Sequence, residues 1–159
     1  MANSDRLTHL NEAGAVHMVD VSAKEVTARV ASARGRFVTT PAVIELLRDQ
    51  ALAKGDALAV ARVAAIVGAK KTADIVPLCH PIGLHEVSVE LTLGEDHVLI
   101  EVTARTAERT GVEMEALTAV AAAGLTLYDM TKAVDRSARL TDVELVSKEG
   151  GRSGRWERS

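Results

Sequence analysis

The chain has 159 residues, of which 47% are hydrophobic, 26% are charged and only 2% are aromatic. This length and composition are typical of one globular domain with a sizeable core, and they exclude a disordered or membrane-spanning chain, because no apolar run approaches roughly 20 residues. The formal net charge of −3 gives no general affinity for nucleic acid or anionic lipid, so a phosphate-bearing ligand would need a local cluster of Lys and Arg.

The N-terminal part of the chain is predicted to begin as an arm and to continue as strands. Residues 1–14 are polar, lack the apolar core of a signal peptide and are expected to form a flexible arm. Residues 15–22 alternate imperfectly and predict a short strand. Residues 26–38 predict a further extended segment, in which Gly35 is expected to form a bulge.

Two helices are predicted next. Thr40 followed by Pro41 is typical of a helix start, with a capping hydroxyl and a proline at the first helical position, and Gly55 is expected to end this helix. Asp56 is then the expected N-cap of a second helix. The apolar positions of this second helix are mostly supplied by Leu58, Val60, Val63, Ile66 and Val67. An irregular stretch bounded by two prolines, 77–81, follows it.

The second half of the chain contains the clearest strand signal. Residues 87–93 and 98–104 alternate between apolar and polar side chains on either side of a Gly-Glu-Asp turn, which predicts a β-hairpin with one buried face. A long Ala-rich helix is predicted from about 112 to 134. Gly124 in its middle costs helix stability and therefore indicates a close contact with another element. A last strand is predicted at 140–146.

From residue 26 onward the predicted order is strand, helices, strand, strand, helix, strand. This order is that of the split β-α-β, ferredoxin-like pattern, an α+β fold whose antiparallel sheet has helices packed on one face. We expect residues 15–159 to form one such catalytic domain, ending in a Gly-rich basic tail at 148–155. Because many unrelated activities share this fold, it does not by itself indicate a function.

Segment 70–81 is the first of three that place polar chemistry in apolar surroundings. Lys70 and Lys71 are interpreted first as cations at a helix end, where the macrodipole favours them. His80, taken alone, is more often a structural hydrogen-bonding residue. Cys79 fits a small buried hydrophobe, and a single thiol favours a reducing, cytoplasmic compartment. No Cys/His cluster has the spacing of zinc ligands.

The other two segments, around 110–118 and 128–135, carry carboxylates. Thr110 and Glu113 have the spacing of a capping box, so Glu113 is interpreted first as a helix cap, whereas Glu115 falls nearer the apolar run. Asp129 and Lys132 share a helix face and are interpreted first as a surface ion pair. The alternative is a lysine whose proton affinity is tuned for acid/base chemistry.

The spacing of two of these carboxylates restricts where a shared site can lie. Glu115 and Asp129 are 14 residues apart, which on an uninterrupted helix is roughly 21 Å along the axis. A nucleotide-sized ligand does not readily touch both from one copy of the helix. Either one carboxylate is structural, or the site is built from two chains of an oligomer.

Six separated motifs lie in order between residues 7 and 155. They are Leu7-Thr8-His9 with His17-Met18-Val19-Asp20-Val21-Ser22, Lys54-Gly55-Asp56, Lys70-Lys71-Thr72 with Pro77-Leu78-Cys79-His80-Pro81, Gly111-Val112-Glu113-Met114-Glu115-Ala116-Leu117-Thr118, Tyr128-Asp129-Met130 with Lys132-Ala133-Val134, and Lys148 with Gly150-Gly151. Together they resemble the MoaC family, the cyclic pyranopterin monophosphate synthases of molybdenum-cofactor biosynthesis, and six motifs in order are far more specific than any one alone.

The resemblance implies an activity and an assembly. The substrate would be (8S)-3′,8-cyclo-7,8-dihydroguanosine 5′-triphosphate, and the product would be cyclic pyranopterin monophosphate, with release of diphosphate. By similarity the protein would be a homohexamer, a trimer of dimers, with its site at the dimer interface. No cofactor would be required, and any Mg²⁺ would be bound mainly by oxygens of the substrate triphosphate.

Carried over residue by residue, the resemblance implies that Asp129 and Lys132 are the central acid/base pair and that Lys54 is a third catalytic position. The substrate-binding positions would be Arg29, Lys70, Leu78, Cys79, His80, Glu113, Met114, Glu115, Lys148 and Arg152. The triphosphate would be held by Lys54, Lys70, Lys148 and Arg152. Glu113 and Glu115 would accept N–H donors from the guanidine-like edge of the base.

Two positions depart from the family pattern. Lys71 stands where many relatives have arginine and Arg152 where lysine is common, but both keep the positive charge.

Three other functions compete with catalysis. A regulatory module that only binds a nucleotide is one alternative, against which the carboxylates and the Asp129/Lys132 pair favour catalysis. An RNA-binding sheet would need aromatic residues in the hairpin, which has none. A purely structural oligomer would leave the basic residues unused.

Overall fold

An antiparallel sheet and four helices make up the computed structural model, which describes residues 10, 11 and 13–159. The strands are β1 (Thr27–Val38), β2 (Glu86–Leu93), β3 (His97–Glu108), β4 (Arg139–Glu149) and β5 (Trp156–Glu157). The helices are α1 (Pro41–Arg48), α2 (Ala57–Lys70), α3 (Thr72–Ile75) and α4 (Glu113–Thr131). The sheet order is β2-β3-β1-β4-β5, and its four long strands give the α+β, ferredoxin-like fold that the sequence predicts.

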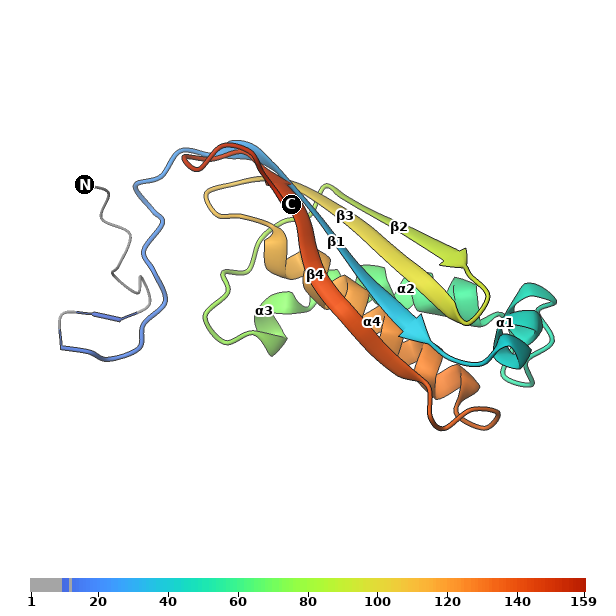
Figure 1. Ribbon diagram of the computed structural model, residues 1–159. Helices are drawn as coiled ribbons and strands as arrows, with labels where there is room; N and C mark the ends of the chain where they lie inside the picture. The colour runs from blue at the N-terminus through green and yellow to red at the C-terminus, as the bar shows by residue number, and fades with distance from the viewer. Residues whose placement is uncertain (1–9, 12) are drawn as a thin grey trace.

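The long helices cover one face of the sheet (Figure 1). α4 packs along β1, β3 and β4, while α2 packs beside α4 and against β2. The apolar face of the predicted hairpin is confirmed, with Val98, Ile100 and Val102 of β3 fully buried against these helices. No helix in the described part of the chain is long and apolar enough to cross a membrane.

Two glycines allow the helix layer to approach the sheet closely. A Cβ on Gly124 of α4 would lie 2.6 Å from the side chain of Leu140, which confirms the predicted close contact. A Cβ on Gly35 of β1 would lie 2.6 Å from the side chain of Val120. The bulge predicted at Gly35 was wrong, because β1 pairs with β3 through Gly35 without a break, and the register shift between Arg34 and Arg36 places the extra residue in β4.

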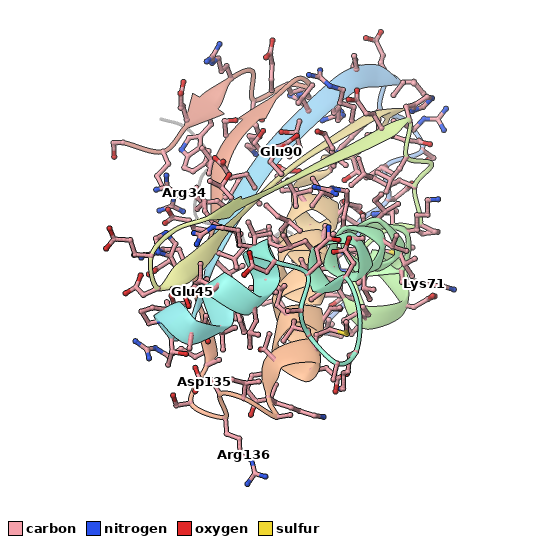
Figure 2. All side chains as sticks on the ribbon, turned by 90° about the vertical axis from the view of Figure 1, so that its right-hand side faces the viewer. Arg34, Glu45, Lys71, Glu90, Asp135 and Arg136 are labelled. Atoms are coloured by element: carbon pink, nitrogen blue, oxygen red, sulfur yellow. The ribbon has the colours of Figure 1, made fainter. Side chains whose placement is uncertain are left out.

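A buried carboxylate fixes the C-terminal end of α4, which ends three residues before the predicted boundary. The Thr39 hydroxyl, at the end of β1, donates to Asp135 Oδ2 at 2.8 Å, and the Ser137 hydroxyl donates to Oδ1 at 2.6 Å. Figure 2 shows Asp135 and Arg136 just beyond the helix. The end of α4 is therefore held against the sheet.

The strand predicted at 15–22 is absent, and this prediction was wrong. Val16 makes an isolated bridge to Leu10, and the segment lies beyond the end of the sheet, where no strand of the described residues pairs with it (Figure 1). Its polar groups are bonded locally, as when the Ser22 N–H donates to Asp20 Oδ1 at 2.8 Å. Of the predicted N-terminal arm, residues 1–9 and 12 lie outside the described residues.

The first helix begins at Pro41, as predicted, but it ends at Arg48 rather than at Gly55. Gln50 takes a left-handed conformation with φ 52°, the Ala51 N–H bonds to the Leu46 carbonyl and the Gln50 N–H to the Leu47 carbonyl. This is a Schellman termination with glutamine where glycine is usual, so the composition did not reveal it. The Thr40 side chain also makes no cap hydrogen bond.

The second helix has its predicted N-cap, since Asp56 accepts from the Ala59 N–H at 3.0 Å, but its buried face was wrongly predicted. Val60, Val63 and Val67 are 45%, 61% and 50% exposed. The buried residues are small instead, namely Ala57, Ala61, Ala65, Gly68 and Ala69. The reason is the tight approach of α2 to α4, which leaves room only for small side chains between the two helices.

Candidate active site

Two cavities adjoin the N-terminal end of α4. The first, which we call the cationic cavity, has a volume of about 240 Å³. Its basic lining residues are Lys24, Arg29, Arg109, Lys148 and Arg152, and its acidic ones are Glu113 and Glu149. The second, which we call the carboxylate cavity, has a volume of about 380 Å³ and is lined by Leu78, Cys79, His80, Met114 and Glu115, among others. The two cavities share Lys24, Thr110, Gly111 and Glu113 and therefore adjoin each other.

Arg29 lies on β1 and is held by backbone carbonyls at the end of β3. Its Nε–H donates to the Glu108 carbonyl at 3.0 Å, and an Nη–H donates to the Arg109 carbonyl at 3.3 Å. The guanidinium packs against Gly151, whose φ of +69° and lack of a side chain both suit this close approach. Arg29 therefore presents a fixed cation to the cavity.

Lys148 and Glu113 form an ion pair across the cationic cavity. Lys148 Nζ lies 3.0 Å from Glu113 Oε1, and both side chains are partly buried. β4 extends to Glu149, three residues past its predicted end, so Lys148 belongs to a strand rather than to a tail. The capping box predicted for Thr110 and Glu113 was wrong, because Val112 occupies the N-cap position without a side-chain hydrogen bond and Glu113 turns to the lysine.

Glu115 is the buried carboxyl group of the site, with only 4% of its surface exposed. Burial, with a smaller contribution from the charge of Glu113, raises the pKa of Glu115 to about 7. The group therefore changes ionisation near neutral pH. Burial and the two neighbouring carboxylates also raise the pKa of the Cys79 thiol, which keeps it protonated and unsuited to act as a nucleophile.

His80 connects the Pro77–Pro81 loop to the N-terminal segment. Its Nε2 lies 2.8 Å from the Val19 carbonyl oxygen. Because a carbonyl only accepts, Nε2 must carry the proton, and Nδ1 of the neutral ring is then an acceptor. His80 thus helps to keep Val19, another lining residue, in the wall of the carboxylate cavity.

A second cluster lies at the other end of α4. Lys132 Nζ donates to Asp129 Oδ1 at 2.6 Å, which confirms the predicted ion pair. Lys54 Nζ donates to Asp129 Oδ2 at 3.0 Å and to the Asp129 carbonyl at 2.6 Å. These bonds, first from Lys132 and then from Lys54, lower the pKa of Asp129 to about 2, and Asp129 in turn raises the pKa of Lys132. In the single chain Asp129 and Lys132 are therefore both charged at neutral pH.

The predicted site residues fall into two groups within one chain. The cavities at the start of α4 bring together Arg29, Leu78, Cys79, His80, Glu113, Met114, Glu115, Lys148 and Arg152. The cluster at its end contains Lys54, Asp129 and Lys132. α4 runs unbroken between them, so Glu115 and Asp129 are roughly 21 Å apart along its axis.

Lys70 belongs to neither group. It is an exposed residue in the last turn of α2 and does not line the cationic cavity or the carboxylate cavity. Its neighbour Lys71 lies at the surface (Figure 2), where it pairs with Asp74 at 3.3 Å. The Leu7-Thr8-His9 motif lies outside the described residues.

Lys24 and Arg109 line the cationic cavity, but their roles were not recognised from the sequence. Lys24 lies in a segment without regular periodicity, and nothing in the pattern distinguishes it from a solvated surface lysine. Arg109 directly precedes Thr110-Gly111, and its position beside this motif was the one available signal. Among the described residues, no group of three or more His, Cys, Asp or Glu side chains could hold a metal ion.

Fold and charge together define a ferredoxin-like α+β protein with a cation-lined cavity suited to a phosphorylated ligand. Residues 18–151 match the MoaC family. The chain is 58% identical over 155 residues to the cyclic pyranopterin monophosphate synthase of Streptomyces coelicolor, covering 98% of this chain and 91% of that one. It is 56% identical over 160 residues to the enzyme of the same name from Rhodospirillum rubrum, covering 99% and 96%. The chain belongs to the MoaC family.

Proposed function

We propose that this chain converts (8S)-3′,8-cyclo-7,8-dihydroguanosine 5′-triphosphate into cyclic pyranopterin monophosphate and diphosphate. The family membership makes it an enzyme of molybdenum-cofactor biosynthesis. The relatives are named for this activity, and the chain aligns with nearly their whole length. The observation that supports the proposal best is the cationic cavity, which gathers five basic residues in a chain of net charge −3. A triphosphate supplies the matching negative charge.

Within this proposal, the cationic cavity binds the phosphates and the carboxylate cavity binds the base. When the sugar hydroxyl attacks the α-phosphorus, the bond to the β-phosphate breaks and diphosphate leaves, so cations on the leaving group stabilise the developing charge. Arg29, Lys148 and Arg152 line the cavity and take this role. Glu113 and Glu115 accept N–H donors from the guanidine-like edge of the base.

The proton transfers of ring opening and ring formation are assigned to Lys132 and Asp129, with Lys54 beside them. In the single chain this cluster is too strongly ionised to exchange protons readily, since Asp129 and Lys132 are each at least half exposed and stabilise each other's charge. Burial under a second chain would disfavour the ammonium and lower the pKa of Lys132. The proposed chemistry therefore requires an interface.

We further propose a homohexamer, a trimer of dimers, in which the start of α4 from one chain meets the end of α4 from its partner. The separation of the two groups along α4 supports this arrangement. In a single chain, the proton-transferring cluster at the end of α4 lies too far from the cavities at its start for one ligand to contact both. The exposed valines of α2, Val60, Val63 and Val67, offer apolar surface for such contacts. Lys70, which lines neither cavity of its own chain, would contribute to a site in the assembly.

The proposal assigns no cofactor to the protein. Any Mg²⁺ would enter with the substrate and be bound mainly by its phosphate oxygens. The location would be the cytoplasm, where a nucleotide substrate is available and the Cys79 thiol stays reduced.

The proposal is tested by incubating the purified protein with the cyclised nucleotide and detecting the pterin product by mass spectrometry. We expect product and diphosphate in equal amounts from the wild type and a loss of at least a hundredfold in kcat for Lys132→Ala, the range for an acid/base group. Arg48→Gln, which changes an exposed arginine on α1, is the matched control. Binding of the nucleotide without product would instead identify a regulatory module.

A further inference from the structure

Arg109 is the basic residue of the cationic cavity whose role neither the family motifs nor the proposed chemistry explains. It stands directly after β3 and lines the cavity together with Arg29 and Lys24. Its Nε–H donates to the Lys24 carbonyl at 3.0 Å, while its own carbonyl accepts from the Arg29 guanidinium at 3.3 Å. Arg109 therefore connects two other cations of the cavity wall through backbone contacts.

The charge balance of the cavity favours an anionic ligand near Arg109. Lys148 is paired with Glu113, but among the described residues no carboxylate lies within ion-pair distance of Lys24, Arg29, Arg109 or Arg152. Elsewhere on the surface, arginines do find partners, as Arg34 does in Glu144. With Glu113 paired to Lys148, Glu149 is the other acidic residue of the lining, so these four cations outnumber the remaining negative charge and repel each other unless an anion joins them.

The hydrogen bonds of Arg109 leave its terminal groups available. Its Nε–H is used by the Lys24 carbonyl, and no acceptor for its Nη groups occurs among the described residues. A guanidinium presents its N–H donors in a planar fork that matches two oxygens of a phosphate. The same residue can thus hold the Lys24 segment and bind an oxyanion at once.

We propose that Arg109 is a further substrate-binding residue, which contacts the terminal phosphates of the triphosphate and positions Lys24 beside them. The inference rests on the proposed function for the identity of the ligand, but the anion site itself does not depend on turnover. Arg109 contacts the diphosphate part of the substrate, so its loss should weaken binding and should also slow the departure of diphosphate.

Isothermal titration with inorganic tripolyphosphate tests the anion site without the reaction. We expect the wild type to bind the probe, Arg109→Gln to bind it about tenfold more weakly, as for the loss of one charge-assisted hydrogen bond, and Arg48→Gln to bind like the wild type. With the cyclised nucleotide, Arg109→Gln should raise KM by a similar factor and lower kcat by less than the hundredfold expected for Lys132→Ala. Unchanged affinity in Arg109→Gln, or an equal loss in Arg48→Gln, would overturn the proposal.

A measurement on the wild type guards against a variant that does not fold. Tripolyphosphate should slow amide hydrogen exchange in peptides covering 20–26 and 105–113, and it should leave the peptide covering 41–50 unchanged. Absence of slowing at 105–113 would contradict the site. If the probe binds as expected but the wild type forms no pterin product, the proposed function fails while the anion site stands.

Discussion

At the scale of single residues, Glu115 is the most perturbed group of the site. It lies in the first turn of α4, where the helix dipole favours a carboxylate, yet burial outweighs this effect and raises its pKa from an ordinary 4.5 to about 7. A carboxyl group poised in this way can bind N–H donors of a base as an anion and lose that affinity when protonated. Ionising this one buried side chain therefore lowers the stability of the fold.

The raised pKa of Glu115 predicts that the stability difference between the wild type and Glu115→Gln depends on pH. Below pH 4.5 the carboxyl is protonated in both the folded and the unfolded state. Between pH 4.5 and 7 it ionises only in the unfolded state, so the free energy of unfolding of the wild type falls as the pH rises. Above pH 7 it is ionised in both states, and the free energy of unfolding levels off. The total effect is on the order of 3 kcal/mol. Glutamine removes it, so the variant should gain stability relative to the wild type across this range in urea unfolding at fixed protein concentration. Parallel pH profiles would contradict the assigned pKa.

Contacts close in sequence were predictable at this scale, and distant ones were not. Asp129 and Lys132 are three residues apart on a helix, so their ion pair follows from spacing alone. Lys54 joins them across 75 positions of sequence, through the turn between α1 and α2, which no periodicity encodes. Glu113 shows the converse error, since its spacing from Thr110 fits a cap but the ammonium of Lys148 is a stronger partner than a backbone N–H.

At the scale of elements, small residues determine how closely α4 approaches its neighbours. Helices α2 and α4 meet at Gly68, where an added Cβ would lie 2.6 Å from the Cβ of Ala122. Gly124 is also buried in a helix, but a Cβ added there would lie 2.6 Å from a δ-methyl group of Leu140 instead. The first neighbour is fixed to the backbone of α4, while the second is the flexible end of a side chain.

These two glycines form a matched pair for mutation. Gly68→Ala should lower the free energy of unfolding by up to about 2 kcal/mol, because overpacking costs about 1–3 kcal/mol and the gain in helix propensity offsets about 1 kcal/mol of it. Gly124→Ala should change it by less, since Leu140 can adopt another rotamer. Chemical denaturation of both variants checks the order. Equal effects, or a more stable Gly68→Ala, would show that α2 and α4 do not approach as closely as described.

The elements themselves were predictable to different degrees. The hairpin of β2 and β3 follows from strict alternation, which only a half-buried strand pair satisfies. The face of α2 was predicted wrongly because large aliphatic side chains are normally the buried ones, whereas here the close helix contact selects alanine and leaves Val63 61% exposed. The end of α1 depends on the left-handed backbone of Gln50, which composition does not signal.

At the scale of the whole molecule, the exposed valines of α2 are proposed to contact another chain of the hexamer. A glutamate at position 63 would place a charge in the proposed contact surface, where it could not be solvated. Val63→Glu should therefore reduce the mass measured by light scattering below that of a hexamer and lower activity, while circular dichroism stays like that of the wild type. A Val63→Glu protein that is still a fully active hexamer would exclude this face of α2 from the interface.

The central claim is that one working site combines the start of α4 from one chain with the end of α4 from another. The direct measurement is complementation between Glu115→Gln and Lys132→Ala, each with low activity alone, after co-expression and confirmation of mixed oligomers by mass spectrometry. Random pairing makes half of the dimers mixed, and each mixed dimer has one intact site and one doubly altered site, so activity should return to about a quarter of the wild-type value. A mixture no more active than its separate components would contradict a site shared between chains.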